Sequence, residues 1–158
     1  MPKDHTASPT VGLGSLMSTC VVDAKENRNV ATVDIPNASI QIDLTSETIV
    51  MKIKGELVGI LIEIDLNAHK DYIVYENNVP VLCLEALKAL HGMSHGSSLF
   101  HGKFVEDLKS YGFELNPHDP CAANEMVDGE QLTVCWHVDD LKASHEDSEV
   151  TDDFCSMD

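Results

Sequence analysis

Residues 122–140 read AANEMVDGEQLTVCWHVDD and predict a β-hairpin whose second strand leads into two carboxylates. Asp128-Gly129 is a strong signal for a two-residue turn, because both residues tolerate the left-handed backbone conformation. The flanking segments, residues 122–126 and 130–138, are therefore expected to pair as antiparallel strands. Asp139-Asp140 then stands at the end of the second strand.

Hydrophobic periodicity outside this hairpin predicts further helices and strands. An amphipathic helix is expected at 97–111, where Phe100 and Phe104 begin an apolar stripe at helical spacing. Residues 38–44 could form either a helical turn or a strand. Residues 57–66 could form either a strand or a helix, and periodicity does not decide between these alternatives. The remaining expected elements are a helix at 15–29, a strand at 30–35, a strand at 49–54, a hairpin of 72–75 with 79–84, and a short helix at 85–90. This order predicts an α+β fold, an antiparallel sheet with helices on one face.

The composition changes at both ends of the chain. Residues 1–14 are rich in Ser, Thr, Pro and Gly and are expected to form a loose lead-in. Residues 146–158 are strongly acidic and contain a single aromatic residue, so this tail is expected to be disordered. A single folded domain is expected between them, over residues 15–145.

The chain of 158 residues carries 27 Asp and Glu against 10 Lys and Arg, a formal net charge of −17. This excess of acid argues against a free-standing nucleic-acid binder, whose affinity comes from Lys and Arg that neutralise phosphates. No apolar run approaches the ~20 residues of a membrane span, and the N-terminus lacks the apolar stretch of a signal peptide. We therefore expect an intracellular protein, cytoplasmic or nuclear, without membrane contact. Its five widely spaced cysteines are expected to stay reduced.

Two of the expected strands end in acidic residues. Asp34 follows residues 30–33, and Asp139 and Asp140 follow the second strand of the hairpin. Carboxylates that are brought together repel one another and favour a hard cation such as Mg²⁺. Two such ions can stabilise the attacking and leaving oxygens of a phosphoryl displacement. Spacing alone favours a more ordinary interpretation, in which Asp34 begins a turn and Asp139-Asp140 form a solvated hairpin tip.

Four phrases containing or separating these acids occur in a fixed order. They are VDIPNA at 33–38, KALHGM at 88–93, SYGF at 110–113 with DPCAAN at 119–124, and WHVDDLK at 136–142. Together they resemble the palm region of reverse transcriptases of the Ty/copia retrotransposon class, in which similar phrases occur in the same order. The resemblance covers about residues 8–147, and four ordered phrases are far more specific than a lone Asp pair.

This resemblance implies an incomplete polymerase palm and an RNA-directed DNA polymerase activity, which is a nucleotidyl transfer. It implies that Asp34, Asp139 and Asp140 are the catalytic carboxylates and that they bind two divalent metal ions, Mg²⁺ or Mn²⁺. The implied partners are an RNA or DNA primer–template and deoxynucleoside triphosphates. Ser39 and Gly92 stand at positions that the family uses to bind the nucleotide.

Departures from the family pattern are equally informative. Ser39 stands where the family carries a bulky Phe or Tyr under the sugar of the incoming nucleotide. The segment HGMSH at 91–95 lacks the Lys and Gln that the family places near template and nucleotide. Compared with the family, we expect neither a basic fingers segment before residue 8 nor a thumb or ribonuclease H domain after Asp158. We therefore expect a truncated or degenerate polymerase that is inactive alone and that can associate through exposed palm surfaces.

Two other functions stay open. An acidic domain derived from the palm, without enzymatic activity, could bind a basic partner, which the charge of −17 favours. His91, His95 and His101 could present imidazoles to zinc, although two glycines oppose a helix there and no fourth ligand is evident. Near the Asp pair, His137 is interpreted as a packing residue rather than a general base, and Trp136 as a core residue.

Overall fold

The computed structural model describes residues 8–44, 48–90, 93 and 96–156, and the chain divides into two compact units. The first unit comprises residues 1–42 and 91–158, and the second comprises residues 43–90. The second unit lies inside the segment for which the sequence predicts one domain. Both units combine helices with an antiparallel sheet, so the expected α+β class is confirmed.

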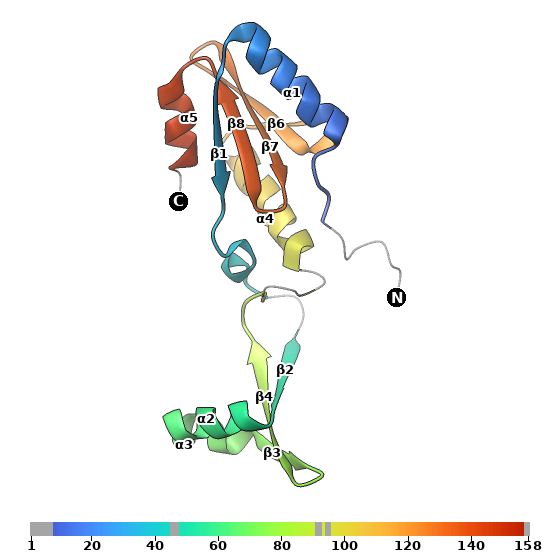
Figure 1. Ribbon diagram of the computed structural model, residues 1–158, viewed down its shortest axis with the longest axis vertical. Helices are drawn as coiled ribbons and strands as arrows, with labels where there is room; N and C mark the ends of the chain where they lie inside the picture. The colour runs from blue at the N-terminus through green and yellow to red at the C-terminus, as the bar shows by residue number, and fades with distance from the viewer. Residues whose placement is uncertain (1–7, 45–47, 91–92, 94–95, 157–158) are drawn as a thin grey trace. The chain divides into compact units, whose positions relative to one another are not determined.

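The first unit is built on a five-stranded antiparallel sheet (Figure 1). Its strands are β1 (Asn29–Asp34), β5 (Glu114–Asn116), β6 (Asp119–Val127), β7 (Glu130–His137) and β8 (Asp140–His145). They lie in the order β1-β8-β7-β6-β5. The hairpin expected around Asp128-Gly129 is confirmed, because these residues join β6 to β7 and have left-handed φ angles of 52° and 93°. A second two-residue turn, Val138-Asp139, joins β7 to β8.

The apolar core of this unit lies on one face of the sheet, against α4 (Gly96–Ser110) and α5 (Ser148–Cys155). Alternate residues of β7, Leu132, Val134 and Trp136, belong to this core and are almost fully buried. Trp136 packs edge-on against Phe104 of α4, with the ring centroids 5.2 Å apart. The expectation that Trp136 is a core residue is therefore confirmed.

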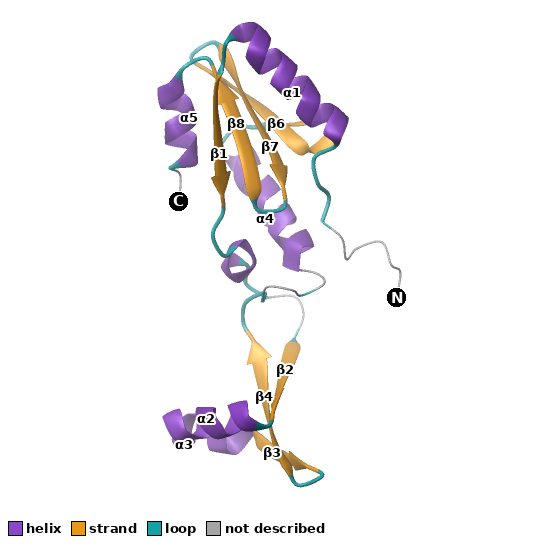
Figure 2. Cartoon of the chain, in the orientation of Figure 1, coloured by secondary structure: helices purple, strands orange, loops and turns teal. Residues whose placement is uncertain are grey.

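The opposite face of the sheet carries α1 (Leu13–Glu26). Lys142 of β8 belongs to this face, because its chain neighbours Leu141 and Ala143 are part of the core. The Lys142 ammonium group contacts Thr19 and Asp23 of α1. Helices therefore cover both faces of the sheet (Figure 2), and the expectation that they lie on one face is wrong. Hydrophobic periodicity does not reveal this packing, because these contacts of α1 with the sheet are polar.

The second unit contains a three-stranded antiparallel sheet and two helices. Its strands are β2 (Ile49–Lys54), β3 (Ile73–Glu76) and β4 (Val79–Ala86), in the order β2-β4-β3. The helices are α2 (Glu56–Ile64) and α3 (Leu66–His69), followed by the 3-10 turn η3 (Lys70–Tyr72). The expected hairpin is confirmed, with Asn77 and Asn78 in left-handed conformations at its turn. Of the two alternatives for residues 57–66, the structure has the helix.

Two short segments near the ends of this unit, residues 38–44 and 85–90, can now be assigned. The helix expected at 85–90 is wrong, because Glu85 and Ala86 pair with Val50 and Ile49 and thereby extend β4. Pairing with a neighbouring strand outweighs the weak helix preference of these residues. Residues 38–44 contain a 3-10 turn, η2 (Ala38–Gln41), which agrees with the first of the two alternatives.

The described part of the acidic C-terminal segment, residues 146–156, is folded, so the expectation of a disordered tail at 146–158 is wrong for these residues. It contains α5, whose first turn is capped by the Asp147 carboxylate, which accepts a hydrogen bond from the Glu149 N–H at 2.9 Å. The acids leave one face of this helix free for Thr151 and Phe154, which are buried, and Phe154 packs against Phe113. Among the described residues, neither this helix nor any other is long and apolar enough to cross a membrane.

Candidate functional site

Asp34 and Asp140 face each other across neighbouring strands. Asp34 is the last residue of β1 and pairs directly with Asp140, the first residue of β8. The Ile35 N–H donates to the Asp139 carbonyl oxygen at 2.9 Å, so the neighbouring Asp34–Asp140 pair is of the non-hydrogen-bonded type. Opposing side chains come closest in pairs of this type. Two acids that are distant in the sequence therefore share one face of the sheet.

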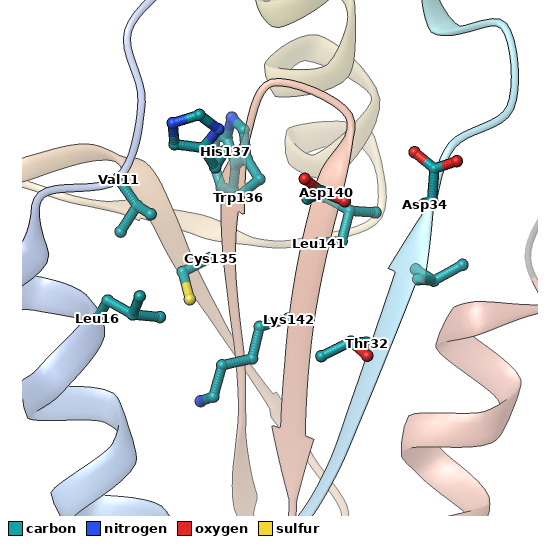
Figure 3. Close-up of a pocket in the computed structure, with 11 residues that line it drawn as sticks. Val11, Leu16, Thr32, Asp34, Cys135, Trp136, His137, Asp140, Leu141 and Lys142 are labelled. Carbon is teal, nitrogen blue, oxygen red and sulfur yellow. The ribbon is translucent and has the colours of Figure 1, made fainter.

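His137 extends this pair into a row across three strands. It is the last residue of β7 and pairs with Asp140. All three side chains line a hollow of about 400 Å³ at this end of the sheet (Figure 3). All three are exposed, so the interpretation of His137 as a packing residue is not supported. The rest of the lining consists of Val11, Leu16, Thr32, Val33, Cys135, Trp136, Leu141 and Lys142.

The turn between β7 and β8 is strained. Val138 has a φ of 61°, a left-handed conformation that is unfavourable for a β-branched residue and that costs about 1–3 kcal/mol. The ladders of β7 with β8 and of β8 with β1 hold this turn on both sides. Asp139 follows Val138 in the turn, where it is half-buried and is not among the residues that line the hollow.

The acids of this site have no cation beside them in the part of the chain that the structure describes. Neither Asp34 nor Asp139 or Asp140 forms an ion pair with a described Lys, Arg or His. Like charges that lie directly opposite on paired strands destabilise the sheet. The Asp34–Asp140 pair therefore favours an added cation.

The donor atoms of this pair fit a hard divalent ion. Mg²⁺ is commonly bound in proteins through one or two carboxylates, with water filling the remaining positions. A cluster of three or more His, Cys, Asp or Glu side chains placed to hold a metal does not occur among the described residues. The structure thus brings two of the three expected carboxylates to one hollow and leaves Asp139 in the adjoining turn. The carboxylate oxygens of Asp34 and Asp140 are suitable ligands for one divalent ion.

The residues expected to bind a nucleotide are described only in part. The backbone of Ser39 lies in η2, which follows β1 after a short turn at Pro36-Asn37, while its side chain lies outside what the structure describes. Gly92 lies outside the described residues altogether. Of the two expected nucleotide-binding residues, the structure therefore describes only the backbone of Ser39, five residues after Asp34.

His101, one of the three histidines considered for zinc, lies beside the core. Its Nδ1 accepts a hydrogen bond from the Trp136 Nε1–H at 3.2 Å, which requires the neutral ring with its proton on Nε2. Burial lowers the pKa of His101 and favours the same neutral form. His91 and His95 lie outside the described residues. The Nδ1 of His101 is therefore engaged by Trp136.

An ion pair beneath α1 connects this helix to the strand that carries Asp140. The Lys142 Nζ contacts the Asp23 Oδ2 at 2.5 Å and donates to the Thr19 Oγ1 at 3.1 Å. The side chains of Lys142 and Asp23 are 13% and 7% exposed, so the pair is largely shielded from solvent. Sequence reasoning missed it. Lys142 itself was the available signal, since a residue two positions after Asp140 on a strand shares its face, but nothing in the sequence marks Asp23 as the partner.

The comparisons with known proteins add no relative to this description. No family model matches the sequence, and neither the curated proteins nor the solved structures contain a significant match.

Proposed function

We propose that the chain is a palm-region fragment of a copia-type retrotransposon reverse transcriptase, an RNA-directed DNA polymerase that uses two divalent metals, and that it is inactive alone. The single observation that supports this most is the direct pairing of Asp34 with Asp140 at the ends of β1 and β8. Both acids belong to phrases that resemble the family, and these phrases lie far apart in the sequence.

The positions of SYGF, DPCAAN and WHVDDLK agree with this proposal, while part of KALHGM lies outside the described residues. SYGF spans the end of α4 and the turn after it, and DPCAAN begins β6, so both lie where elements of the first unit meet. WHVDDLK covers the end of β7, the strained turn and the start of β8. WHVDDLK thereby places acidic side chains at the rim of a rigid scaffold, where residues that carry chemistry are expected, whereas most of DPCAAN is buried in β6.

The proposal gives each acid a role. Asp34 and Asp140 bind Mg²⁺ or Mn²⁺ through their carboxylate oxygens, and Asp139 contributes the third carboxylate from the turn. The bound metal would supply charge stabilisation to the phosphoryl oxygens of a deoxynucleoside triphosphate. Ser39 and Gly92 are the nucleotide-binding positions in this proposal, and the partner is an RNA or DNA primer–template. The small side chain of Ser39 is expected to exclude the 2′-hydroxyl of a ribonucleotide less effectively than the aromatic ring that the family carries at this position.

Charge explains why the fragment is expected to be inactive alone. Binding of a primer–template depends on several Lys and Arg contacts to phosphates, each of which releases counterions. The chain has 10 such residues against 27 acids, and two divalent ions supply only four positive charges. The remaining net charge is strongly negative, so the chain repels a duplex.

A calorimetric Mn²⁺ titration tests the proposed metal site. We expect saturable binding to the full chain that is weakened at least about tenfold by Asp34→Asn and by Asp140→Asn, because each change removes a ligand and a charge. Asp128→Asn is the matched control, since Asp128 is an exposed acid in the β6–β7 turn and the change removes the same charge. Equal binding by all four proteins would mean that Mn²⁺ associates with surface acids in general and would contradict the proposal.

Primer extension with Mn²⁺ and deoxynucleoside triphosphates tests the expected inactivity separately. The chain alone should give no product above background. Template-directed extension that Asp140→Asn abolishes would overturn the expectation of inactivity while supporting the polymerase assignment.

The second candidate function is a non-enzymatic acidic interaction domain, which one observation favours. Leu57, Ile60 and Ile64 form an apolar stripe on α2 and are 61%, 52% and 74% exposed. Exposed apolar surface of this kind promotes association with a partner or a second copy. This function requires no metal, so Mn²⁺ binding that is indifferent to Asp34→Asn and Asp140→Asn would favour it over the polymerase assignment.

A further inference from the structure

We infer that Asp23 is a positioning residue: it holds Lys142 away from the Asp34–Asp140 carboxylates and so keeps this pair open to a divalent cation. The inference rests on the proposed function of the pair. It concerns the contact between Asp23 of α1 and Lys142 of β8. Asp23 lies in none of the phrases that resemble the family.

Lys142 is placed to compete for these carboxylates. It lies two residues after Asp140 on β8 and pairs with Thr32, which lies two residues before Asp34 on β1. Residues two apart on a strand share a face and are separated by about 7 Å along it. Lys142 therefore stands one step from both acids, and the three side chains line the same hollow. The flexible four-carbon stem of lysine allows its ammonium group to cover such a separation.

Two acceptors on α1 prevent this approach. The Asp23 carboxylate and the Thr19 hydroxyl both contact the Lys142 ammonium group, at 2.5 and 3.1 Å. Figure 3 shows the result: the Lys142 side chain extends away from Asp34 and Asp140. Burial of both partners strengthens this attraction relative to an exposed ion pair.

The second oxygen of Asp23 indicates that stability alone does not explain this residue. The Asp23 Oδ1 is buried and has no hydrogen-bond partner among the described residues. A buried carboxylate with an unsatisfied oxygen carries a desolvation cost, and a buried ion pair often contributes no more stability than apolar residues of the same volume. The cost is understandable if the location of the Lys142 charge matters for the neighbouring site.

Release of Lys142 would change the charge of that site. An ammonium group beside Asp140 would occupy one carboxylate and repel an approaching divalent ion. Removal of the Asp23 charge is therefore expected to weaken metal binding at Asp34 and Asp140, although the ion-pair partner of Asp23 is Lys142 and neither of these acids.

Calorimetric titration of the full chain with Mn²⁺ tests this inference. We expect Asp23→Asn to bind Mn²⁺ about tenfold more weakly than wild type, because Lys142 then competes for the carboxylates. The double variant Asp23→Asn/Lys142→Met should return to within about twofold of wild type, since it removes the competitor. Glu26→Gln is the matched control, because Glu26 lies on the same helix and the change alters the net charge by the same amount. It should leave the affinity unchanged within about twofold.

Three results would overturn the inference. Asp23→Asn could bind Mn²⁺ as wild type does, the double variant could stay as weak as the single one, or Glu26→Gln could weaken binding equally. Circular dichroism establishes that each variant is folded. If Asp23→Asn fails to fold, Thr19→Val removes the second acceptor without changing the charge, and it should weaken binding about twofold. Wild-type affinity in a folded Thr19→Val would then overturn the inference.

A readout without metal separates this inference from the proposed function. A carbodiimide joins a lysine amine to a carboxylate that contacts it, and mass spectrometry locates the link. Wild type should give a Lys142–Asp23 link, and Asp23→Asn should give a link from Lys142 to Asp140 or Asp34. Absence of the new link overturns the inference whether or not Mn²⁺ binds. Appearance of the new link in a chain whose Mn²⁺ binding is indifferent to Asp34→Asn overturns only the proposed function.

Discussion

Val138, in the turn that also contains Asp139, has a backbone conformation that is unfavourable for valine. With a φ of 61° it occupies the first central position of a two-residue hairpin turn, where glycine is the favoured residue. Replacement by glycine removes strain of about 1–3 kcal/mol and adds an entropic cost of about 0.5–1 kcal/mol. We therefore expect Val138→Gly to raise the free energy of unfolding by about 1 kcal/mol, as measured by urea denaturation.

Val30→Gly is the control for this prediction. Val30 is an exposed valine within β1 whose φ is not positive, so the same change there removes no strain and should destabilise the chain by about 1 kcal/mol. A loss of stability in both variants would mean that the Val138 backbone is not strained. A gain in Val138→Gly alone would indicate that the sequence keeps a costly residue beside the candidate site.

How much of the site could be predicted from the sequence depends on the residue. Asp34 and Asp140 could be predicted to approach each other, because each follows residues that are recognisable as a strand and belongs to a specific phrase. The exposure of His137 could not, since its position at the rim depends on which faces the helices cover. The partner of Lys142 could not be predicted either, because Asp23 is 119 residues away and nothing in the sequence shows which element packs against its helix.

The C-terminal helix shows how few apolar residues are needed to fold an acidic segment. In α5, Phe154 is 8% exposed and packs against Phe113 with ring centroids 5.7 Å apart. We expect Phe154→Ala to lower the free energy of unfolding by about 3 kcal/mol, the usual cost of truncating a buried phenylalanine. Asp153→Ala on the exposed side of the same helix should stay within about 0.5 kcal/mol of wild type. Equal effects of the two changes in urea denaturation would mean that α5 does not pack against the core.

The elements that the sequence predicts well are those with strong local signals. Both hairpins could be predicted from Asp128-Gly129 and Asn77-Asn78, because these residues tolerate the positive φ angles that such turns require. Composition gave the wrong expectation for the acidic tail, since capping by Asp147 and burial of Phe154 depend on tertiary contacts. The extension of β4 to Ala86 likewise depends on β2, which lies elsewhere in the sequence.

Net charge is the property that belongs to the whole molecule rather than to any element. At −17, unpaired acids repel one another throughout the folded chain, and folding brings them closer together. Exposed ion pairs such as Lys103–Asp107 act in the opposite direction, but each contributes little. Because the acids outnumber the basic residues by 27 to 10, repulsion is expected to exceed attraction.

Added salt should therefore stabilise this protein. Raising NaCl from about 0.02 to 0.5 M shortens the screening length several-fold, and we expect the free energy of unfolding in urea to rise by about 1 kcal/mol. The double variant Asp34→Asn/Asp140→Asn is the control for specific binding of Na⁺ to the candidate site. It should keep most of the gain, because many other acids produce the repulsion. A fall in stability with salt would mean that the ion pairs outweigh the excess acid, and a gain lost entirely in the double variant would place the destabilising repulsion at the Asp34–Asp140 pair itself.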